Sequence, residues 1–198
     1  MKDTRNNILL ASQELLAKFG YAGYSLGAVA ELLNVSKGVV TYHFPQKEHL
    51  IQTLITAYFS DAAEYMAKHM VIDRTAPEAL ASYIEANLRY AADNRKRTLA
   101  IMRIIANHRS KDGALAFTDQ DNQIHQPLIE IFQYGQSEEG SFRTFAPELM
   151  AMLVRSAIDI VSGRIATHGI EDTEEAIQET VRTFMLATRR EGHEEDSK

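Results

Sequence analysis

The spacing of apolar residues is the feature that most constrains the fold of this chain. Apolar side chains recur at intervals of three and four residues along almost all of the 198 residues, and no stretch shows sustained alternation with a period of two. A helix repeats every 3.6 residues and a strand every two, so this pattern predicts helices rather than a sheet. A hydrophobic fraction of 45% is enough for a packed core. We therefore expect an all-α protein.

Glycines, prolines and capping residues divide the chain into helices. Gly20 is placed to end a first helix in the left-handed conformation, and Asn34 tolerates the same conformation in a turn. Ser25 and Ser36 are good N-caps for a second and a third short helix. Longer helices are expected over 47–70, 77–94, 95–110, 123–136, 147–167 and, with Thr173 as its cap, 173–190, separated by loops at 111–121 and 137–141 and followed by a charged tail at 191–198.

Three short helices within about 45 residues, with a tight turn between the second and third, are typical of a helix-turn-helix. The third helix of such a unit presents small or polar side chains outward, here Lys37, Gly38, Thr41 and His43, with Val40 and Phe44 inward. Gly38 requires a reason, because glycine inside a helix costs about 1 kcal/mol relative to alanine. Close approach of the backbone to DNA and tight packing against a neighbouring helix are both open explanations.

The order and spacing of residues between Phe19 and Leu50 resemble the N-terminal signature of the TetR family. The matching positions are Phe19-Gly20-Tyr21, Tyr24-Ser25, Val29-Ala30, the continuous run from Asn34 to Phe44, Lys47-Glu48 and Leu50. The resemblance implies a helix-turn-helix DNA-binding domain over 1–46 and a larger helical domain over 47–198 for effector binding and dimerisation. The helix over 47–70 would link the two.

The resemblance also implies roles for individual residues in DNA binding. Ser25, Tyr42, His43 and Lys47 would contact phosphates, and the helix N-terminus at Ser36 is a further place for a phosphate to dock. Lys37, Gly38, Val39 and Thr41 would face base edges. The chain departs from the family pattern at four positions, namely Asn34 in place of the usual turn glycine, Gly27 inside the second helix, Thr41 in place of a frequent aromatic residue, and Gln46 as a weaker cap. The operator sequence therefore does not transfer from the family.

The effector site is predicted from segments that form the pocket in the related fold. The candidate lining residues are Tyr90, Met102, Ile105, His108, Phe117, His125, Phe132 and Tyr134. Aromatic and methionine side chains suit an apolar cavity, and either histidine could anchor a polar group. The alternative for each residue is an ordinary place in the core. The seven histidines form no metal-ligand pattern, so neither a metal nor a cofactor is expected.

Two stripes of apolar residues in the C-terminal part of the chain are candidate dimerisation surfaces. The first consists of Ala151, Val154, Ala157, Ile158, Val161 and Ile165, and the second of Ile177, Val181, Phe184 and Met185. Together they have the composition of half an intersubunit four-helix bundle, although burial within one chain would give the same pattern. The resemblance, and the need to place two DNA-binding units on a palindrome, favour a homodimer.

These observations predict a ligand-responsive transcriptional regulator, a repressor that binds a palindromic double-stranded DNA operator as a homodimer and is released by an unknown small molecule that moves the fourth helix. The alternative is a DNA-binding regulator controlled by a protein partner or without a small-molecule effector. An enzyme is not expected, because no phosphate-binding loop, nucleophile elbow or catalytic carboxylate pair occurs.

Composition and charge are compatible with this function without indicating it. The net charge is −6, yet residues 1–50 carry five Lys or Arg and four acidic residues, so the acidic excess lies elsewhere. No apolar run approaches the roughly 18 residues of a membrane span. The polar N-terminus does not read as a signal peptide, and cysteine is absent. A cytoplasmic protein without membrane association is expected.

Overall fold

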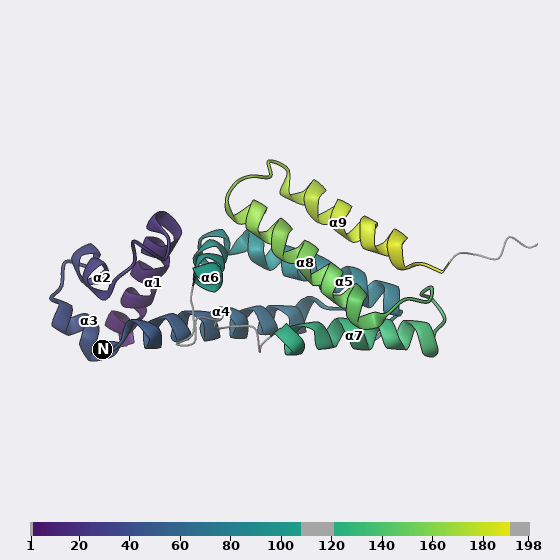
Figure 1. Ribbon diagram of the computed structural model, residues 1–198, viewed down its shortest axis with the longest axis horizontal. Helices are drawn as coiled ribbons and strands as arrows, with labels where there is room; N and C mark the ends of the chain where they lie inside the picture. The colour runs from purple at the N-terminus through teal and green to yellow at the C-terminus, as the bar shows by residue number, and fades with distance from the viewer. Residues whose placement is uncertain (1, 108–120, 191–198) are drawn as a thin grey trace, which may run out of the picture.

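The computed structural model describes residues 2–107 and 121–190, and within these ranges it is helical almost throughout (Figure 1). The helices are α1 (Lys2–Phe19), α2 (Leu26–Leu32), α3 (Lys37–His43), α4 (Lys47–His69), α5 (Ala76–Asp93), α6 (Arg95–Asn107), α7 (Asp121–Ser137), α8 (Pro147–Ala166) and α9 (Thr173–Thr188). The prediction of an all-α protein is confirmed. None of these helices is long and apolar enough to cross a membrane.

Local chemistry sets the ends of the N-terminal helices as predicted. Gly20 and Asn34 have positive φ angles of 73° and 52°, so each lies in the left-handed region that ends or interrupts a helix. The Ser25 Oγ accepts a hydrogen bond from the Ala28 amide at 3.1 Å and caps α2. Ser36 occupies the N-cap position of α3 in an extended conformation, but its side chain makes no capping hydrogen bond.

Two later boundaries differ from prediction. Thr173 was expected to cap the last helix, but it is the first helical residue, and the Asp172 carboxylate caps α9 by accepting from the Glu175 amide at 2.8 Å. The helix expected from residue 77 begins at Ala76, where Thr75 and Glu78 form a reciprocal capping box. The loop predicted over 111–121 lies outside the described residues except for Asp121, which is the first residue of α7, and the tail over 191–198 lies outside them altogether.

The described core falls into two hydrophobic clusters. The first is shared by α1, α2, α3, the first half of α4 and one face of α6. The second is shared by α5, α7, α8 and α9. We call α1–α3 the N-terminal unit and α5, α7, α8 and α9 the C-terminal unit. Figure 1 shows the N-terminal unit at one end of an elongated molecule, with α4 running beneath it toward α7 and α6 standing between the two units. The two units are therefore connected through both α4 and α6.

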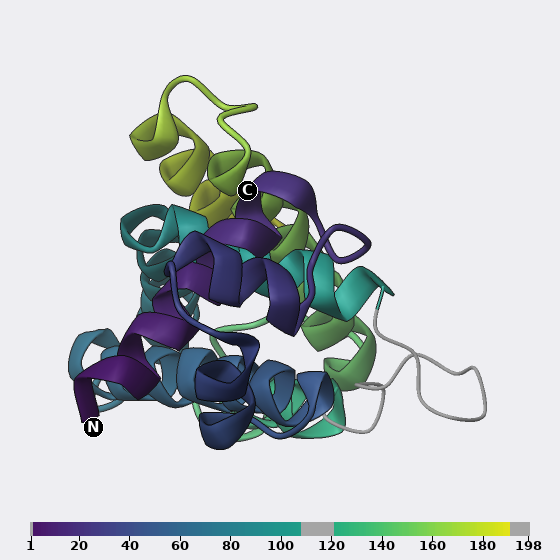
Figure 2. The ribbon, with the colours of Figure 1, turned by 90° about the vertical axis from the view of Figure 1, so that its left-hand side faces the viewer.

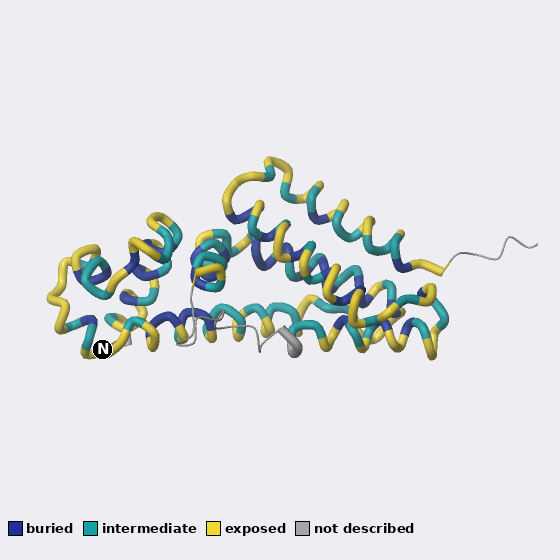
Figure 3. Tube along the Cα trace, viewed as in Figure 1, coloured by how far each residue is buried: buried dark blue, intermediate teal, exposed yellow. Residues whose placement is uncertain are grey.

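The apolar stripe predicted for dimerisation is largely used inside the chain. Ala151, Val154, Ile158 and Ile165 of α8 are buried in this single chain, as is Ile177 of α9. They pack inward because α8 contacts α5, α6 and α7 along this face. Burial within one chain, the alternative that the sequence left open, therefore accounts for these five residues, and the homodimer stays a prediction. Figure 3 shows exposed positions alternating with these buried ones along α8.

Candidate nucleic-acid interface

A tight turn joins α2 to α3 at the far end of the molecule, which faces the viewer in Figure 2. Within the turn, the Asn34 amide donates to the Glu31 carbonyl at 3.1 Å and the Val35 amide to the Ala30 carbonyl at 3.0 Å. Both bonds require the chain to reverse at Asn34, which its left-handed backbone allows. The turn therefore fixes the direction of α3 relative to α2, as a helix-turn-helix requires.

The two faces of α3 are clearly different. Val40 and the following Phe44 are fully buried in the first cluster, which confirms their predicted inward orientation. Tyr42 has 72% of its surface exposed. The other outward residues are Lys37 and Gly38, which are exposed, and Val39, Thr41 and His43, which are half-buried. One face of the helix thus anchors it, and the other is available to a partner.

Side-chain contacts brace the outward residues. The Thr41 hydroxyl lies 3.1 Å from the Lys37 carbonyl and 3.2 Å from that of Gly38, so its hydrogen is used within α3. The Tyr42 and His43 rings meet edge to face with centroids 5.2 Å apart. These contacts limit the freedom of the outward face before any partner binds.

The surroundings of Gly38 decide between its two explanations. A Cβ atom added there would meet only the Ser36 Oγ, at an ordinary van der Waals distance of 3.6 Å. Tight packing against another helix of this chain therefore does not explain the glycine. The other explanation, close approach of DNA to the α3 backbone, stays a prediction.

Two positively charged residues near α3 are already engaged within the chain. The Lys47 Nζ donates to the Tyr24 carbonyl at 3.0 Å and lies 4.2 Å from the centre of the Tyr21 ring, and burial lowers the pKa of this amine. Lys47 thus ties α4 to the segment before α2, and its predicted phosphate contact stays a prediction. The Arg5 guanidinium lies over the Phe44 ring at 4.9 Å. Sequence reasoning missed Arg5 because the contact joins residues far apart in the chain.

The structure does not gather the predicted effector residues at one place. Ile105 packs against the first cluster, Phe132 is fully buried in the second, and Tyr134 has 54% of its surface exposed. His125 is half-buried on α7, and Met102 faces Gly163 of α8. His108 and Phe117 lie outside the described residues.

Tyr90 belongs to an aromatic cluster that the sequence did not reveal. Its ring lies 5.3 Å from that of Tyr58 and 5.5 Å from that of Tyr65, and its hydroxyl donates to the Tyr58 carbonyl at 3.2 Å. Burial raises the pKa of Tyr90 to about 12, so its hydroxyl is neutral. Tyr58 in turn shares a hydrogen bond of 2.9 Å with Thr98 of α6. The seven-residue spacing of Tyr58 and Tyr65 on α4 was the available sequence signal.

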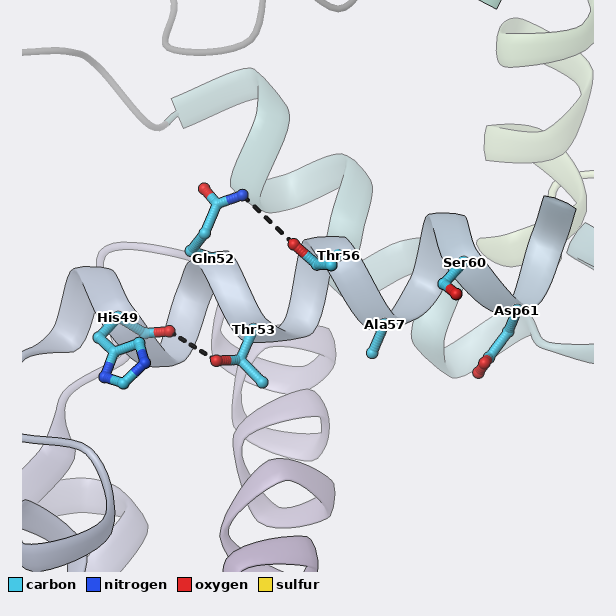
Figure 4. A pocket seen from close by; sticks show the side chains of 7 residues that line it. All are labelled: His49, Gln52, Thr53, Thr56, Ala57, Ser60 and Asp61. Atoms are coloured by element: carbon cyan, nitrogen blue, oxygen red, sulfur yellow. Dashed lines mark hydrogen bonds between the residues drawn. The ribbon is translucent and has the colours of Figure 1, made fainter.

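The part of the chain that the structure describes has shallow surface hollows on α4 and between α1 and α2. One, of about 430 Å³, follows a single face of α4 (Figure 4), and it is lined by His49, Gln52, Thr53, Thr56, Ala57, Ser60 and Asp61. The other, of about 370 Å³, lies between α1 and α2 and includes Lys96. Neither contains a predicted effector residue. Among the described residues, no three His, Asp or Glu side chains converge as metal ligands.

Both the N-terminal sequence and the fold are similar to those of known proteins. Residues 8–54 match the family described as bacterial regulatory proteins, tetR family. A TetR-family regulatory protein from Rhodococcus RHA1 is 20% identical, with a TM-score of 0.80 over 97% of this chain and 100% of that one. A putative transcriptional regulator from Saccharomonospora viridis in complex with choline is 18% identical, with a TM-score of 0.79 over 96% of this chain and 100% of that one.

A third structure concerns the control of antibiotic production by bacterial hormones. It is 25% identical, with a TM-score of 0.73 over 96% of this chain and 100% of its own. A search of curated protein sequences found no match. The matched segment spans the helix-turn-helix whose outward face was described above, and the fold similarity extends over nearly the whole chain. Residues 8–54 thus match the TetR-family helix-turn-helix model, and the chain has the fold of solved structures described as TetR-family regulators.

Proposed function

We propose that this chain is a TetR-family transcriptional regulator, a repressor that binds a palindromic operator as a homodimer and leaves it when a small molecule binds. The observation that carries the proposal is the outward face of α3, where Lys37, Gly38 and Tyr42 are exposed on a helix anchored by buried Val40 and Phe44. A rigid helix with one free polar face can enter the major groove without rearrangement. Residues 1–46 would act as the DNA-binding domain and residues 47–198 as the effector and dimerisation domain.

The proposed contacts are of two kinds: some position the protein on the DNA backbone, and others read the base sequence. Ser25, Ser36, Tyr42, His43 and Lys47 would bind phosphates, and Lys37, Gly38, Val39 and Thr41 would face base edges. A net charge of −6 means that affinity depends on these few contacts rather than on a general attraction to DNA. Two copies of α3, about 34–36 Å apart in a dimer, would read the two halves of a palindrome.

Gly38→Ala separates the DNA-contact role of Gly38 from a packing role. A Cβ has space there, and alanine favours the helix, so the variant should be more stable toward unfolding by about 0.5 kcal/mol. Operator affinity should nevertheless fall about tenfold or more, because the methyl group occupies space needed by the DNA backbone or bases. Gel shifts on an operator selected from random duplexes, with thermal unfolding in parallel, measure both effects.

Gly27→Ala is the matched control. Gly27 is also the second residue of a seven-residue helix, and an added Cβ there would meet only the Ser25 Oγ, at 3.7 Å. The same small gain in stability is expected without loss of operator affinity. If Gly38→Ala binds the operator as tightly as the unchanged protein, the outward face of α3 does not approach DNA in the proposed way.

Support for an effector comes from the polar groups enclosed between α4, α5 and α6. Tyr58, Tyr90 and Thr98 form a hydrogen-bonded set there, next to Met102 on α6. Buried hydroxyls beside aromatic and apolar side chains are the usual composition of a small-molecule site. The choline complex of a structural neighbour is a further reason to expect an effector here. Of the predicted lining residues, Tyr90, Met102 and Ile105 are therefore retained in the proposal.

Ligand response can be tested without knowing the natural effector. A thermal-shift screen of small metabolites that includes choline identifies compounds that stabilise the protein, since a ligand of the folded state raises the melting temperature. We expect at least one such compound to weaken operator binding by about 5- to 150-fold, the range of typical allosteric couplings. If every stabilising compound leaves operator affinity unchanged, release by a small molecule is wrong and control by a protein partner becomes the better explanation.

A further inference from the structure

A single arginine on α6 bonds to the end of the first helix. The Arg103 Nη1 donates to the Leu16 carbonyl at 3.0 Å and to the Ala17 carbonyl at 2.8 Å. Because α1 ends at Phe19, these carbonyls belong to its last turn, where helical partners run out; the Leu16 carbonyl also accepts from the Gly20 amide at 3.0 Å. A guanidinium at this end also complements the negative pole of the helix. Arg103 therefore satisfies the C-terminal end of α1 from outside the N-terminal unit.

Packing along α6 reinforces this contact. Ala100, Ile101 and Ile104 belong to the same buried cluster as Ile8 and Leu16 of α1. Among the described elements, α1 packs most extensively against α6. The N-terminal unit thus completes its core with a helix that follows the C-terminal unit's α5 in the chain.

The residue next to Arg103, Met102, contacts a different helix, α8. A Cβ at Gly163 of α8 would come within 2.6 Å of the Met102 Cε, so the Met102 side chain fits into the space that this glycine leaves. One turn of α6 therefore contacts α1 through Arg103 and α8 through Met102. A shift of α8, or of α6 itself, would reach the N-terminal unit by direct contact, without passing along α4.

We propose that Arg103 is a positioning residue that fixes the orientation of the N-terminal unit relative to the C-terminal unit. The part of this inference that concerns two DNA-binding units on one operator rests on the proposed function. Two N-terminal units held at a fixed orientation discriminate sharply between half-site spacings, whereas loosely held ones do not. A contact that only adds stability would not affect this discrimination.

The first test measures operator affinity as a function of half-site spacing. Duplexes carry the selected operator with its centre lengthened or shortened by one or two base pairs, and the proteins are the unchanged chain, Arg103→Ala and Arg89→Ala. Arg89 is the control because it also joins two helices, bonding Glu174 of α9 at 2.9 Å, but lies away from the N-terminal unit. The ratio of affinity for the native spacing to affinity for an altered spacing should be about tenfold smaller for Arg103→Ala than for the unchanged chain. A change of this size is within the range of typical coupling energies. An unaltered preference would overturn the proposal.

The second test needs neither DNA nor a dimer. The chain has no cysteine, so Glu31→Cys on α2 and Glu130→Cys on α7 provide a specific pair of spin labels. Labelled chains are diluted with unlabelled ones to isolate the distance within one subunit. Arg103→Ala should broaden the distance distribution, whereas Arg89→Ala should not, and equal widths would contradict the proposal. If Arg103→Ala does not fold, Arg103→Gln is measured instead, because its amide cannot supply the charge.

The two tests distinguish this inference from the proposed function. If the unchanged protein shows no preference for paired half-sites, dimeric reading of a palindrome is wrong, and the spin-label widths still decide the role of Arg103. If the preference is present but neither variant of Arg103 alters it or the widths, the proposed function stands and the positioning role does not.

Discussion

Replacing both Lys37 and Tyr42 with alanine is expected to abolish a gel shift on the selected operator. Tyr42 has 72% of its surface exposed and Lys37 is exposed at the start of the same helix, so neither change removes core packing. A good polar contact to a base or phosphate contributes about 1–3 kcal/mol. A dimer loses each contact twice, which amounts to at least about a thousandfold in affinity. Binding by the unchanged protein should also weaken as salt rises.

A matched double variant controls for the loss of a lysine and a tyrosine. Lys68 has 65% of its side-chain surface exposed and Tyr134 has 54% of its residue surface exposed, and both lie outside the N-terminal unit. Lys68→Ala with Tyr134→Ala should keep full operator affinity, and circular dichroism should show that both double variants are folded. If Lys37→Ala with Tyr42→Ala still binds the operator normally, α3 is not the recognition helix.

The N-terminal unit could be predicted because its determinants are local. Gly20 and Asn34 adopt left-handed backbones that few other residues tolerate, and Ser25 caps the helix that follows it. The buried positions of Val40 and Phe44 follow from helical periodicity alone. By contrast, Asp172 and Thr173 are adjacent and both can cap a helix, so the sequence leaves this boundary uncertain by one position; the structure has Asp172 as the cap and Thr173 as the first helical residue.

Contacts between segments far apart in the sequence could not be predicted from local capping residues and helical periodicity. The bonds from Arg103 to the end of α1 and from Lys47 to the Tyr24 carbonyl depend on how helices cross, which periodicity does not specify. The effector residues show the same limit. Family resemblance indicates which segments line a pocket, but Phe132 and Tyr134 are two positions apart on α7, and one is buried while the other is exposed. Side chains two apart on a helix do not share a face.

The long helix α8 shows why the sequence alone could not separate a dimer surface from burial within one chain. Apolar residues occur on both sides of it, so its sequence does not say which side packs inward. Ala151 and Val154 are buried against the rest of the chain, whereas Leu149 and Leu153, at comparable spacing, remain about half exposed. The outward apolar residues on the two last helices are Leu149, Met152, Leu153, Ile160 and Leu186, with exposures between 47% and 66%. Such a row is unfavourable in water and suits a second copy of the chain.

Leu153→Glu combined with Ile160→Glu should therefore convert the protein to a monomer. Burying each apolar side chain at an interface contributes about 1.5–3 kcal/mol, and in a two-fold interface each residue counts twice. Introduced carboxylates would in addition be desolvated against apolar neighbours without a counter-charge. Sedimentation velocity should show the unchanged chain as a dimer and the variant as a folded monomer. Operator affinity should fall by more than about a hundredfold, because one copy of α3 then binds alone.

Ile72→Glu is the control for adding a carboxylate to an exposed apolar site. Ile72 has 77% of its surface exposed and lies between α4 and α5, away from the outward row on α8. This variant should remain dimeric and bind the operator normally. Because Leu153 and Ile160 point away from the buried core, loss of the dimer should come without loss of helicity. A Leu153→Glu, Ile160→Glu variant that sediments as a dimer would place the interface elsewhere on the chain, and the spacing of the two recognition helices would then have to be set by a different face.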